Sequence, residues 1–517
     1  MKRIIQITLL VLIALTSIVI YACTIRGVSG NPPLSSFKNN LDQPTKPFEL
    51  SPERGRYLLT MSLAENGSFA LSKPLADAAL PDVGYIDGRF YIYFAPGISV
   101  LALPFYQIGK VFHASQVASF ASITFFAILN GVLLFYIARK ILRLGASYSL
   151  FGAFLFAFGT TSWSYAITLY QHHVTLFFLL SGFIAAWKFR MESKLSWAYS
   201  AYVWASYGAA LFLDYPNAVL LAPVMVYHFL SAWQVKQLTT VTRVQLRLSY
   251  IITAVFCIAL FALHGYYNTV NFGGPLRLSG GLIGYKTIRE QGLQSKQRGA
   301  EKIKELQSEK EVKNFFKEEL TPKGVSILLA SRDRGLLFYS PVLIIGILGL
   351  LMSLSVLTAE TTLLIGIVAV NLFLYSSWGD PWGGWAYGPR YLIPTMAVLS
   401  LFTGTYLSGL RGRLRRIGIK IVTLMLFGYS SAVSLLGALT TNAVPPKIEA
   451  DYLKMHYNFL HNLIFYSHGQ SGSYFYNVVL SKQVSLQQYA FGLWGVIMII
   501  ATILLFVSPL FDTQHES

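Results

Sequence analysis

Apolar runs of close to 20 residues recur along the whole sequence and are separated by short polar segments. A helix of about 20 apolar residues is long enough to cross the ~30 Å hydrocarbon core of a membrane. The pattern therefore predicts an all-α polytopic membrane protein, a single integral membrane domain over residues 1–517. We expect about twelve transmembrane helices, over residues 4–23, 117–138, 148–168, 174–190, 197–213, 216–234, 248–268, 336–356, 360–377, 391–410, 419–440 and 489–509.

Composition and charge placement support this prediction. Hydrophobic residues make up 54% of the chain and charged residues only 12%, against about 25% charged in soluble proteins. The net charge is +18, but the basic residues gather in short segments between apolar runs. A nucleic-acid interface would interleave them with aromatics on one exposed domain, so nucleic acid is not expected as a partner. The clusters are Arg139, Lys140 and Arg143; Lys188, Arg190 and Lys194; Lys236, Arg243 and Arg247; and Arg411, Arg413, Arg415, Arg416 and Lys420.

These clusters fix the predicted orientation. With Met1 in the cytoplasm, every cluster falls on the cytoplasmic side, as the positive-inside rule requires. We expect a multi-pass protein of the inner (cytoplasmic) membrane with both termini cytoplasmic. Residues 94–113 are also apolar, but a span there would move the cluster at Arg139 outside, and Pro96, Gly97 and Pro104 interrupt the run. This segment is therefore predicted to be re-entrant or interfacial.

The predicted topology leaves four segments on the non-cytoplasmic face: 24–93, 269–335, 378–390 and 442–488. We expect amphipathic helices in segment 24–93, and a charged helix from Glu301 to Glu319 in the second segment. The two cysteines, Cys23 and Cys257, lie in apolar runs and do not form a disulfide framework. No repeat relates the two halves, so an inverted-repeat transporter is not supported.

Ionisable residues gather on the non-cytoplasmic face. A carboxylate there can act as a general base towards an acceptor hydroxyl, and arginines can clamp a phosphate. This combination suits a lipid-phosphate substrate whose headgroup lies at that depth. The glycine pair beside Trp382 would let backbone and an aromatic ring approach a sugar. The candidates are Glu53, Arg54, His172, Asp214, Arg334 and Arg390.

Structural explanations exist for the same residues. Ser51 resembles an N-cap followed by Pro52, which makes Glu53 a helix-start residue. Asp214 is equally explained by an ion pair, and Arg334 and Arg390 by contact with lipid headgroups. His172 and His173 are adjacent and lack the i, i+4 spacing of a helical metal pair. Residues 379–388 are also compatible with a simple tight turn.

Taken together, several phrases resemble GT-C type membrane glycosyltransferases, related to the protein mannosyltransferases and lipid A aminoarabinose transferases. The first is Ser51-Pro52-Glu53-Arg54-Gly55-Arg56-Tyr57, which is similar to the family's acidic motif. The other phrases follow in the family's order, at residues 62–70, 85–97, 159–172, 214–216, 267–273, 334–341 and 382–391. The likeness covers nearly the whole chain.

The resemblance implies a reaction with a polyprenyl-phosphate-linked sugar donor on the non-cytoplasmic face. It implies that Glu53 activates the acceptor and that Arg334 and Arg390 bind the lipid phosphate. The predicted substrate pocket contains Arg54, Tyr57, His172, Asp214 and Trp382. The chain departs from the family at Phe94-Ala95-Pro96-Gly97, which stands where Lys-Pro-Pro-Gly is usual. It also has a single carboxylate in the acidic motif, so a divalent metal is compatible with the sequence but not required by it.

The leading hypothesis is a glycosyltransferase that moves a sugar from such a donor to a lipid, glycan or protein acceptor. Two alternatives remain open at this point. A transporter or flippase of a lipid-linked saccharide would need charged residues through the cytoplasmic half of the spans. A non-catalytic assembly subunit would keep the architecture without the chemistry.

Overall fold

The computed structural model describes residues 2–37, 46–237, 242–290, 316–317, 319 and 321–510. Within them a helix occupies each of the twelve predicted spans, which confirms the all-α polytopic class. Seven helical segments are long and apolar enough to cross a membrane, and four more apolar helices are shorter. The twelve helices are α1 (Lys2–Thr24), α5 (Ser115–Tyr136), α6 (Ala146–Phe158), α8 (His172–Met191), α9 (Ser196–Leu213), α11 (Ala222–Ala232), α12 (Leu248–Phe272), α17 (Leu343–Ser353), α18 (Ala359–Ser376), α19 (Ile393–Ser408), α20 (Arg413–Leu439) and α23 (Leu486–Thr502).

Three predicted spans are broken helices. Residues 148–168 divide into α6 and α7 (Ser162–Ala166), residues 216–234 into α10 (Asn217–Leu220) and α11, and residues 336–356 into α16 (Leu336–Tyr339) and α17. Pro223 and Pro341 stand at two of the breaks, where a proline lacks the N–H that an uninterrupted helix needs. Such breaks are tolerated in a membrane where neighbouring protein groups satisfy the freed backbone.

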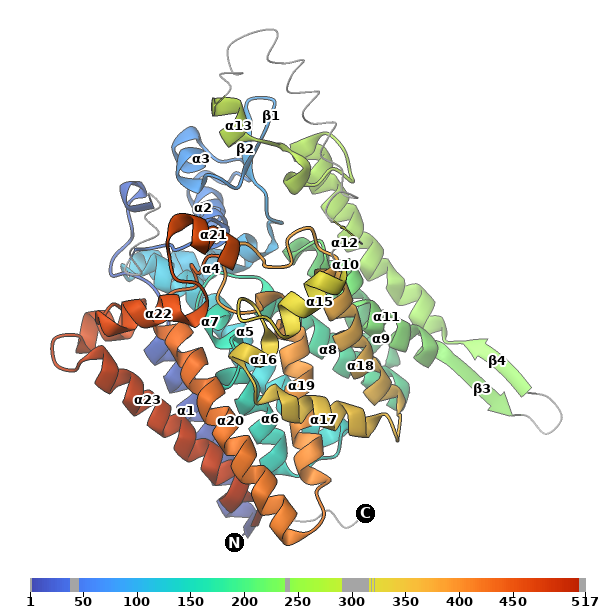
Figure 1. Ribbon diagram of the computed structural model, residues 1–517. Coiled ribbons are helices and arrows are strands. Elements are labelled where there is room, and N and C mark those ends of the chain that lie inside the picture. Colours follow the sequence, from blue (N-terminus) through green and yellow to red (C-terminus); the bar gives the residue numbers. More distant parts are fainter. Residues whose placement is uncertain are drawn as a thin grey trace.

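The two ends of the bundle differ in character (Figure 1). The start of α1 lies at one end, together with the α19–α20 connection that carries Arg411 and Arg413. The opposite end carries α2 (Ser51–Asn66), α3 (Lys73–Ala79), α13 (Tyr285–Glu290) and α21 (Lys447–Leu453). The segments predicted to be non-cytoplasmic therefore meet at the end away from this basic connection.

Segment 24–93 contains a hairpin that the sequence analysis did not predict. Strands β1 (Val83–Ile86) and β2 (Arg89–Ile92) pair antiparallel, with Val83 opposite Ile92. Asp87 and Gly88 both have positive φ, as a two-residue hairpin turn requires. The short strand β5 (Ile283–Gly284) adds to β1, in the order β2-β1-β5. The sheet thus joins segment 24–93 to segment 269–335, which are both predicted to be non-cytoplasmic.

Residues 97–111 form α4 (Gly97–Val111), which contains Pro104. Fifteen helical residues extend about 22 Å, less than the ~30 Å needed to span a bilayer. The helix packs against α2 and α5. Nine further helices, most of them short, and a hairpin complete the described chain. They are α15 (Thr321–Leu329), α22 (Asn458–Ser467), η1 (Leu34–Phe37), η2 (Ile137–Ile141), η3 (Ser279–Gly281), η7 (Arg390–Leu392), η8 (Tyr476–Leu480), η9 (Ile503–Val507), η10 (Ser508–Leu510), and the β3 (Trp233–Gln237)–β4 (Thr242–Leu246) hairpin. Most of the predicted charged helix from Glu301 to Glu319 lies outside the described residues.

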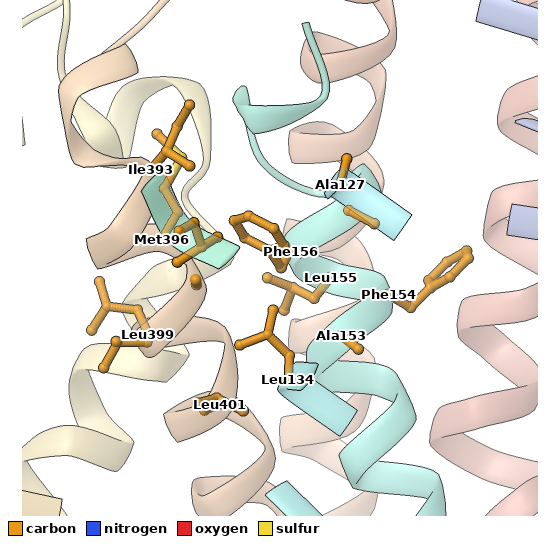
Figure 2. Packing of buried hydrophobic residues seen from close by; sticks show 14 of the residues in the cluster. Ala127, Leu134, Ala153, Phe154, Leu155, Phe156, Ile393, Met396, Leu399 and Leu401 are labelled. Carbon is orange, nitrogen blue, oxygen red and sulfur yellow. The ribbon is translucent and has the colours of Figure 1, made fainter. Parts of the chain in front are cut away.

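The core of the bundle lies where α5, α6 and α19 meet (Figure 2). Leu134, Phe156 and Met396 come from these three helices and are fully buried. Next to them α17 approaches α19 closely, because Gly346 and Gly349 have no side chain. A Cβ at Gly349 would lie 2.0 Å from the Phe402 carbonyl oxygen. Small residues at such contacts are typical of membrane helix packing, and they give the site above a rigid base.

The start of α2 corrects one prediction. Leu50, and not Ser51, is the N-cap residue, and Glu53 occupies the third helical position. The Glu53 Oε1 atom accepts the backbone N–H groups of Glu49, at 2.6 Å, and Leu50, at 3.3 Å. Ser51 instead donates its hydroxyl to Asp82. A carboxylate that accepts two backbone N–H groups stabilises the start of a helix more than a serine hydroxyl that accepts one. The Glu53 side chain therefore caps α2 in place of Ser51.

Candidate active site

A cavity of about 460 Å³ lies where the outer segments meet the ends of α8, α9, α18 and α19. Its wall is rich in aromatic side chains and carries three charged residues, Arg56, Asp214 and Arg390. A mostly apolar hollow with a few convergent polar groups is the usual form of a small-molecule site. The lining residues are Pro52, Arg56, Tyr93, Phe94, Tyr170, Gln171, Asp214, Tyr215, Pro216, Val219, Leu278, Gly280, Gly281, Phe316, Tyr375, Trp378, Arg390 and Tyr391.

Arg390 projects into this cavity with unused donors. Its Nε and Nη1 atoms are buried and have no hydrogen-bond acceptor among the described residues. The guanidinium lies over two rings, 5.3 Å from the centre of Tyr170 and 5.5 Å from that of Tyr391. Tyr391 is in turn stacked on Tyr375 at 4.2 Å. The aromatic walls orient the cation and leave its N–H groups for an anionic ligand.

The turn before Arg390 is built to hold it in place. Gly383, Gly384 and Gly388 all have positive φ, a conformation that residues with a Cβ rarely adopt. The Tyr165 hydroxyl accepts the Tyr387 backbone N–H at 2.8 Å and so anchors the turn on α7. The glycine-rich phrase is therefore a tight turn, and this turn delivers Arg390 to the cavity.

Arg56 reaches the same cavity from α2 and belongs to a hydrogen-bonded chain of three residues. Its Nη2 donates to the Gln171 Oε1 at 2.8 Å, and the Gln171 Nε2 donates to the Asp214 Oδ2 at 2.8 Å. Its guanidinium also lies 4.5 Å from the Phe94 ring centre. Burial lowers the pKa of Arg56 to about 10, and Asp214 opposes the change, so Arg56 remains charged at neutral pH. The side-chain amide of Gln171 thus holds the Arg56 guanidinium at its oxygen and the Asp214 carboxylate at its nitrogen.

Glu53 lies on α2 between two cavity-lining residues, Pro52 and Arg56, and does not itself line the cavity. It is 2% exposed, and its Oε2 atom has no hydrogen-bond partner in the described part of the chain. Burial raises the pKa of Glu53 to about 7, and the Glu49 carboxylate adds to the shift. Glu49 itself is paired with Arg26. A carboxyl group with a pKa near 7 is suited to accept a proton at neutral pH.

The side chain of Tyr170 lies near the charges of Arg56, Arg390 and Glu53. Burial raises the pKa of its hydroxyl well above the usual value, the Arg390 charge opposes the shift, and the Glu53 charge adds to it. The hydroxyl oxygen has no partner in the described structure, like the Glu53 Oε2 and the Arg390 Nε. Buried polar atoms are normally hydrogen-bonded. The Tyr170 hydroxyl and the Arg390 Nε, both on the wall of one cavity, are therefore available to a ligand.

Arg334 is placed differently from its prediction as a phosphate-binding residue. It is fully buried outside the cavity, and all five of its N–H groups are used within the protein. The acceptors are the carbonyl oxygens of Trp382, Gly384, Val444 and Asp333 and the Asp333 carboxylate, at 2.8 to 3.1 Å. A guanidinium has only five donors. Arg334 therefore ties the glycine-rich turn to residues 333 and 444 and has no N–H left for a phosphate.

Four other predicted pocket residues do not line the cavity either. Arg54 lines a separate cavity of about 770 Å³ next to α3 and α13. The Tyr57 hydroxyl pairs with that of Ser115 at 2.8 Å within an apolar cluster. The His172 ring lies parallel to Tyr170 at 6.1 Å, and Trp382 offers its carbonyl to Arg334. Of the eight predicted site residues, Asp214 and Arg390 line the cavity.

Among the cavity residues that the sequence analysis did not select, Arg56, Tyr170 and Gln171 contribute polar groups that the proposed site uses. Each lies within a phrase that carried the family resemblance, at 51–57 or 159–172. No pattern in those phrases distinguishes the residue that faces the cavity from its neighbours. The described residues contain no group of three or more His, Cys, Asp or Glu side chains that could hold a metal ion.

No protein-family model and no curated protein matches the sequence. Solved structures do match. ArnT from Cupriavidus metallidurans bound to undecaprenyl phosphate is 12% identical over 98% of this chain and 78% of its own, with a TM-score of 0.47. The archaeal oligosaccharyltransferase AglB from Archaeoglobus fulgidus, in complex with an inhibitory peptide and a dolichol-phosphate, is 15% identical over 87% of this chain, with a TM-score of 0.46.

Both proteins are GT-C glycosyltransferases, the type that the sequence phrases resemble. This chain spans 58% of the length of the archaeal oligosaccharyltransferase. At TM-scores below 0.5, the similarity assigns neither an activity nor a substrate to the chain.

Proposed function

We propose that this protein is a membrane glycosyltransferase that moves a sugar from a polyprenyl-phosphate-linked donor to a lipid, glycan or protein acceptor on the non-cytoplasmic face. The observation that carries the proposal is the pair of guanidinium groups, Arg56 and Arg390, on the wall of one aromatic cavity. Arg390 has buried N–H groups without an acceptor there. Two cations with free donors suit a phosphate group.

In the proposed reaction the acceptor oxygen attacks the anomeric carbon of the donor sugar. The bond from that carbon to the phosphate oxygen breaks, and the lipid phosphate leaves with the electron pair. Arg390 and Arg56 stabilise the negative charge that develops on this phosphate. They are preorganised by the rings of Tyr170, Tyr391 and Phe94, so little reorganisation accompanies the step.

The proposed final recipient of the acceptor's proton is Glu53, which lies on α2 between the cavity-lining Pro52 and Arg56 and not in the cavity wall itself, so one water would bridge the acceptor and the carboxylate. Its Oε1 is held by two backbone N–H groups, which leaves Oε2 for this role. A pKa of about 7 keeps much of the group ionised at neutral pH while leaving it basic enough to accept the proton. Asp214 acts as a positioning residue, because its carboxylate orients the Gln171 amide towards Arg56.

The proposal is tested by sugar transfer from a panel of radiolabelled polyprenyl-phosphate donors in membranes. Glu53→Gln should lower transfer at least ~100-fold, the contribution expected of a general base, with unchanged expression. Glu65→Gln is the matched control, since Glu65 lies on the same helix and pairs with Lys110 at the surface. Equal transfer by wild type and Glu53→Gln would remove Glu53 from the mechanism. Translocation of the lipid-linked sugar without transfer would favour the flippase alternative.

A further inference from the structure

A second large cavity, of about 1020 Å³, opens between α11 and α18. It lies at the far end of α8 from the candidate active site: His172 begins that helix beside the first cavity, and Arg190 ends it beside the second. Eighteen helical residues separate the two, about 27 Å along the helix axis. The charged end of the second cavity is therefore remote from the first cavity, whereas its other end, at Ala222 and Val370, comes within a few residues of Val219 and Tyr375 in the first cavity.

The end of this cavity near Arg190 is charged. The Arg190 guanidinium lies 5.7 Å from the Tyr227 ring centre and pairs with Glu360 at 3.4 Å. The Tyr227 hydroxyl donates to the same carboxylate at 2.7 Å. Arg247, just before α12, lies over the Phe189 ring at 4.7 Å and donates to the Phe189 carbonyl. Two arginines therefore line this end of the cavity, and one of them pairs with a carboxylate, which leaves a net positive charge.

Away from this charged end the walls become apolar. Along α18 the lining runs from Thr362 through Gly366 to Val370, and along α11 it runs from Ser231 to Pro223. The stretch of α18 from Ala359 to Val370 extends about 16 Å. Gly366 leaves space there, because a Cβ at that position would meet only Pro223, at 3.5 Å. One end is thus cationic and the remainder is a narrow apolar trough.

We infer that this groove binds one anionic phospholipid, with its phosphate between Arg190 and Arg247 and an acyl chain along Gly366. A phospholipid has a matching arrangement, with a charged headgroup at one end and hydrocarbon chains along the rest of its length. The flanking residues Val226 and Leu230 are 56% and 63% exposed, as expected for side chains that face hydrocarbon. The net positive charge selects an anionic headgroup, and the site lies at the end of the spans predicted to be cytoplasmic, where basic residues attract such lipids.

The site is tested by native mass spectrometry of the detergent-purified full chain. The probes are phosphatidylglycerol, phosphatidylcholine with the same acyl chains, and inorganic phosphate. Wild type should retain phosphatidylglycerol about tenfold more strongly than phosphatidylcholine, and the double variant Arg190→Gln/Arg247→Gln should lose that preference. Arg413→Gln is the matched control, because Arg413 is an exposed arginine outside the groove.

The apolar half of the groove has its own variants. Gly366→Leu should fill the trough and lower phosphatidylglycerol retention, whereas Gly366→Ala should leave it unchanged because its Cβ makes an ordinary contact. Equal retention of both lipids by wild type, equal loss in Arg413→Gln, or competition by inorganic phosphate at the affinity of the lipid would each overturn the inference. The readout is lipid binding alone, so it does not depend on sugar transfer.

Discussion

Arg56 and Arg390 come from helices more than 300 positions apart, yet both guanidinium groups lie within 6 Å of the centre of the Tyr170 ring. One comes from the first outer segment and the other from the turn before α19. Like charges this close in a half-buried wall repel each other. An anion between them would relieve that repulsion, which is why the pair is the basis of the proposed donor site.

Gln171 should control how Arg56 meets the donor. Gln171→Leu removes the acceptor of Arg56 and the donor to Asp214. We expect the KM for the donor to rise about tenfold, as for a lost charged hydrogen bond, with a smaller change in kcat. Steady-state transfer kinetics check this. Gln487→Leu, which removes a single exposed bond to the Tyr466 carbonyl, should change neither constant, and an equal effect of both variants would contradict the positioning role.

Arg334 should behave as a stabilising residue. Arg334→Gln leaves the carbonyl groups of Trp382, Gly384 and Val444 and the buried Asp333 carboxylate without their partner, so we expect a loss of about 4 kcal/mol in the free energy of unfolding. This loss should appear as a lower midpoint of thermal unfolding in detergent. Arg332→Gln makes the same charge change at an exposed neighbour and should shift the midpoint little. If Arg334→Gln unfolds like wild type but fails to bind donor, Arg334 contacts the phosphate after all.

The Glu53 carboxyl should give stability a particular pH dependence. Its folded-state pKa of about 7 is above the ordinary value of 4.5, so the folded protein binds the proton more tightly than the unfolded chain. The resulting stabilisation is full below pH 4.5 and is lost as the pH rises through 7, by up to about 3 kcal/mol. Glu53→Gln cannot ionise, so its stability relative to wild type should increase from pH 5 to pH 8. Thermal unfolding midpoints that differ by a constant amount across this range would contradict the assigned pKa.

Gly388 should be required for the turn that delivers Arg390. Its φ is +67°, and a Cβ there would lie 2.9 Å from the Thr161 Cγ2 atom. Gly388→Ala should cost about 2 kcal/mol from backbone strain and overlap together. Gly384→Ala is the control: its φ is also positive, but its nearest neighbour is 3.8 Å away, so about 1 kcal/mol is expected. Thermal unfolding of both variants measures the difference between their losses of stability. Equal losses would show that the Thr161 side chain can move away from the added methyl group at no energetic cost.

The sequence was sufficient to predict the helices because the apolar runs have the length of a membrane span. It located the breaks less well, since Pro223 and Pro341 lie inside apolar runs that hydropathy alone joins. The β1–β2 hairpin was missed although Asp87-Gly88 is a strong turn signal. Its strands are four residues each, and they are stabilised by β5 from a distant segment.

Only part of the candidate site was predicted, again because contacts between distant segments decide which residues face the cavity. The phrases around Glu53, Asp214 and Arg390 were found by resemblance, and the fold brings them together. The family resemblance could not distinguish the roles of Arg334 and Arg390, because each of them stands just before a predicted span. Only their contacts differ: one guanidinium is saturated by carbonyl groups, and the other faces a cavity. Likewise Arg56 and Arg54 are two residues apart on α2, and the helix turns only Arg56 towards the cavity.

The most direct test of the proposed donor site is the binding of polyprenyl phosphate to the purified, reconstituted protein, compared with the polyprenol that lacks the phosphate. Wild type should bind the phosphate at least about tenfold more tightly than the alcohol, because a charged hydrogen-bonded contact contributes 1.5 to 3 kcal/mol, about tenfold or more in affinity. Arg390→Gln should abolish this difference, and Arg89→Gln, at an exposed position on β2, should preserve it. Equal preference for the phosphate in wild type and Arg390→Gln would contradict the account.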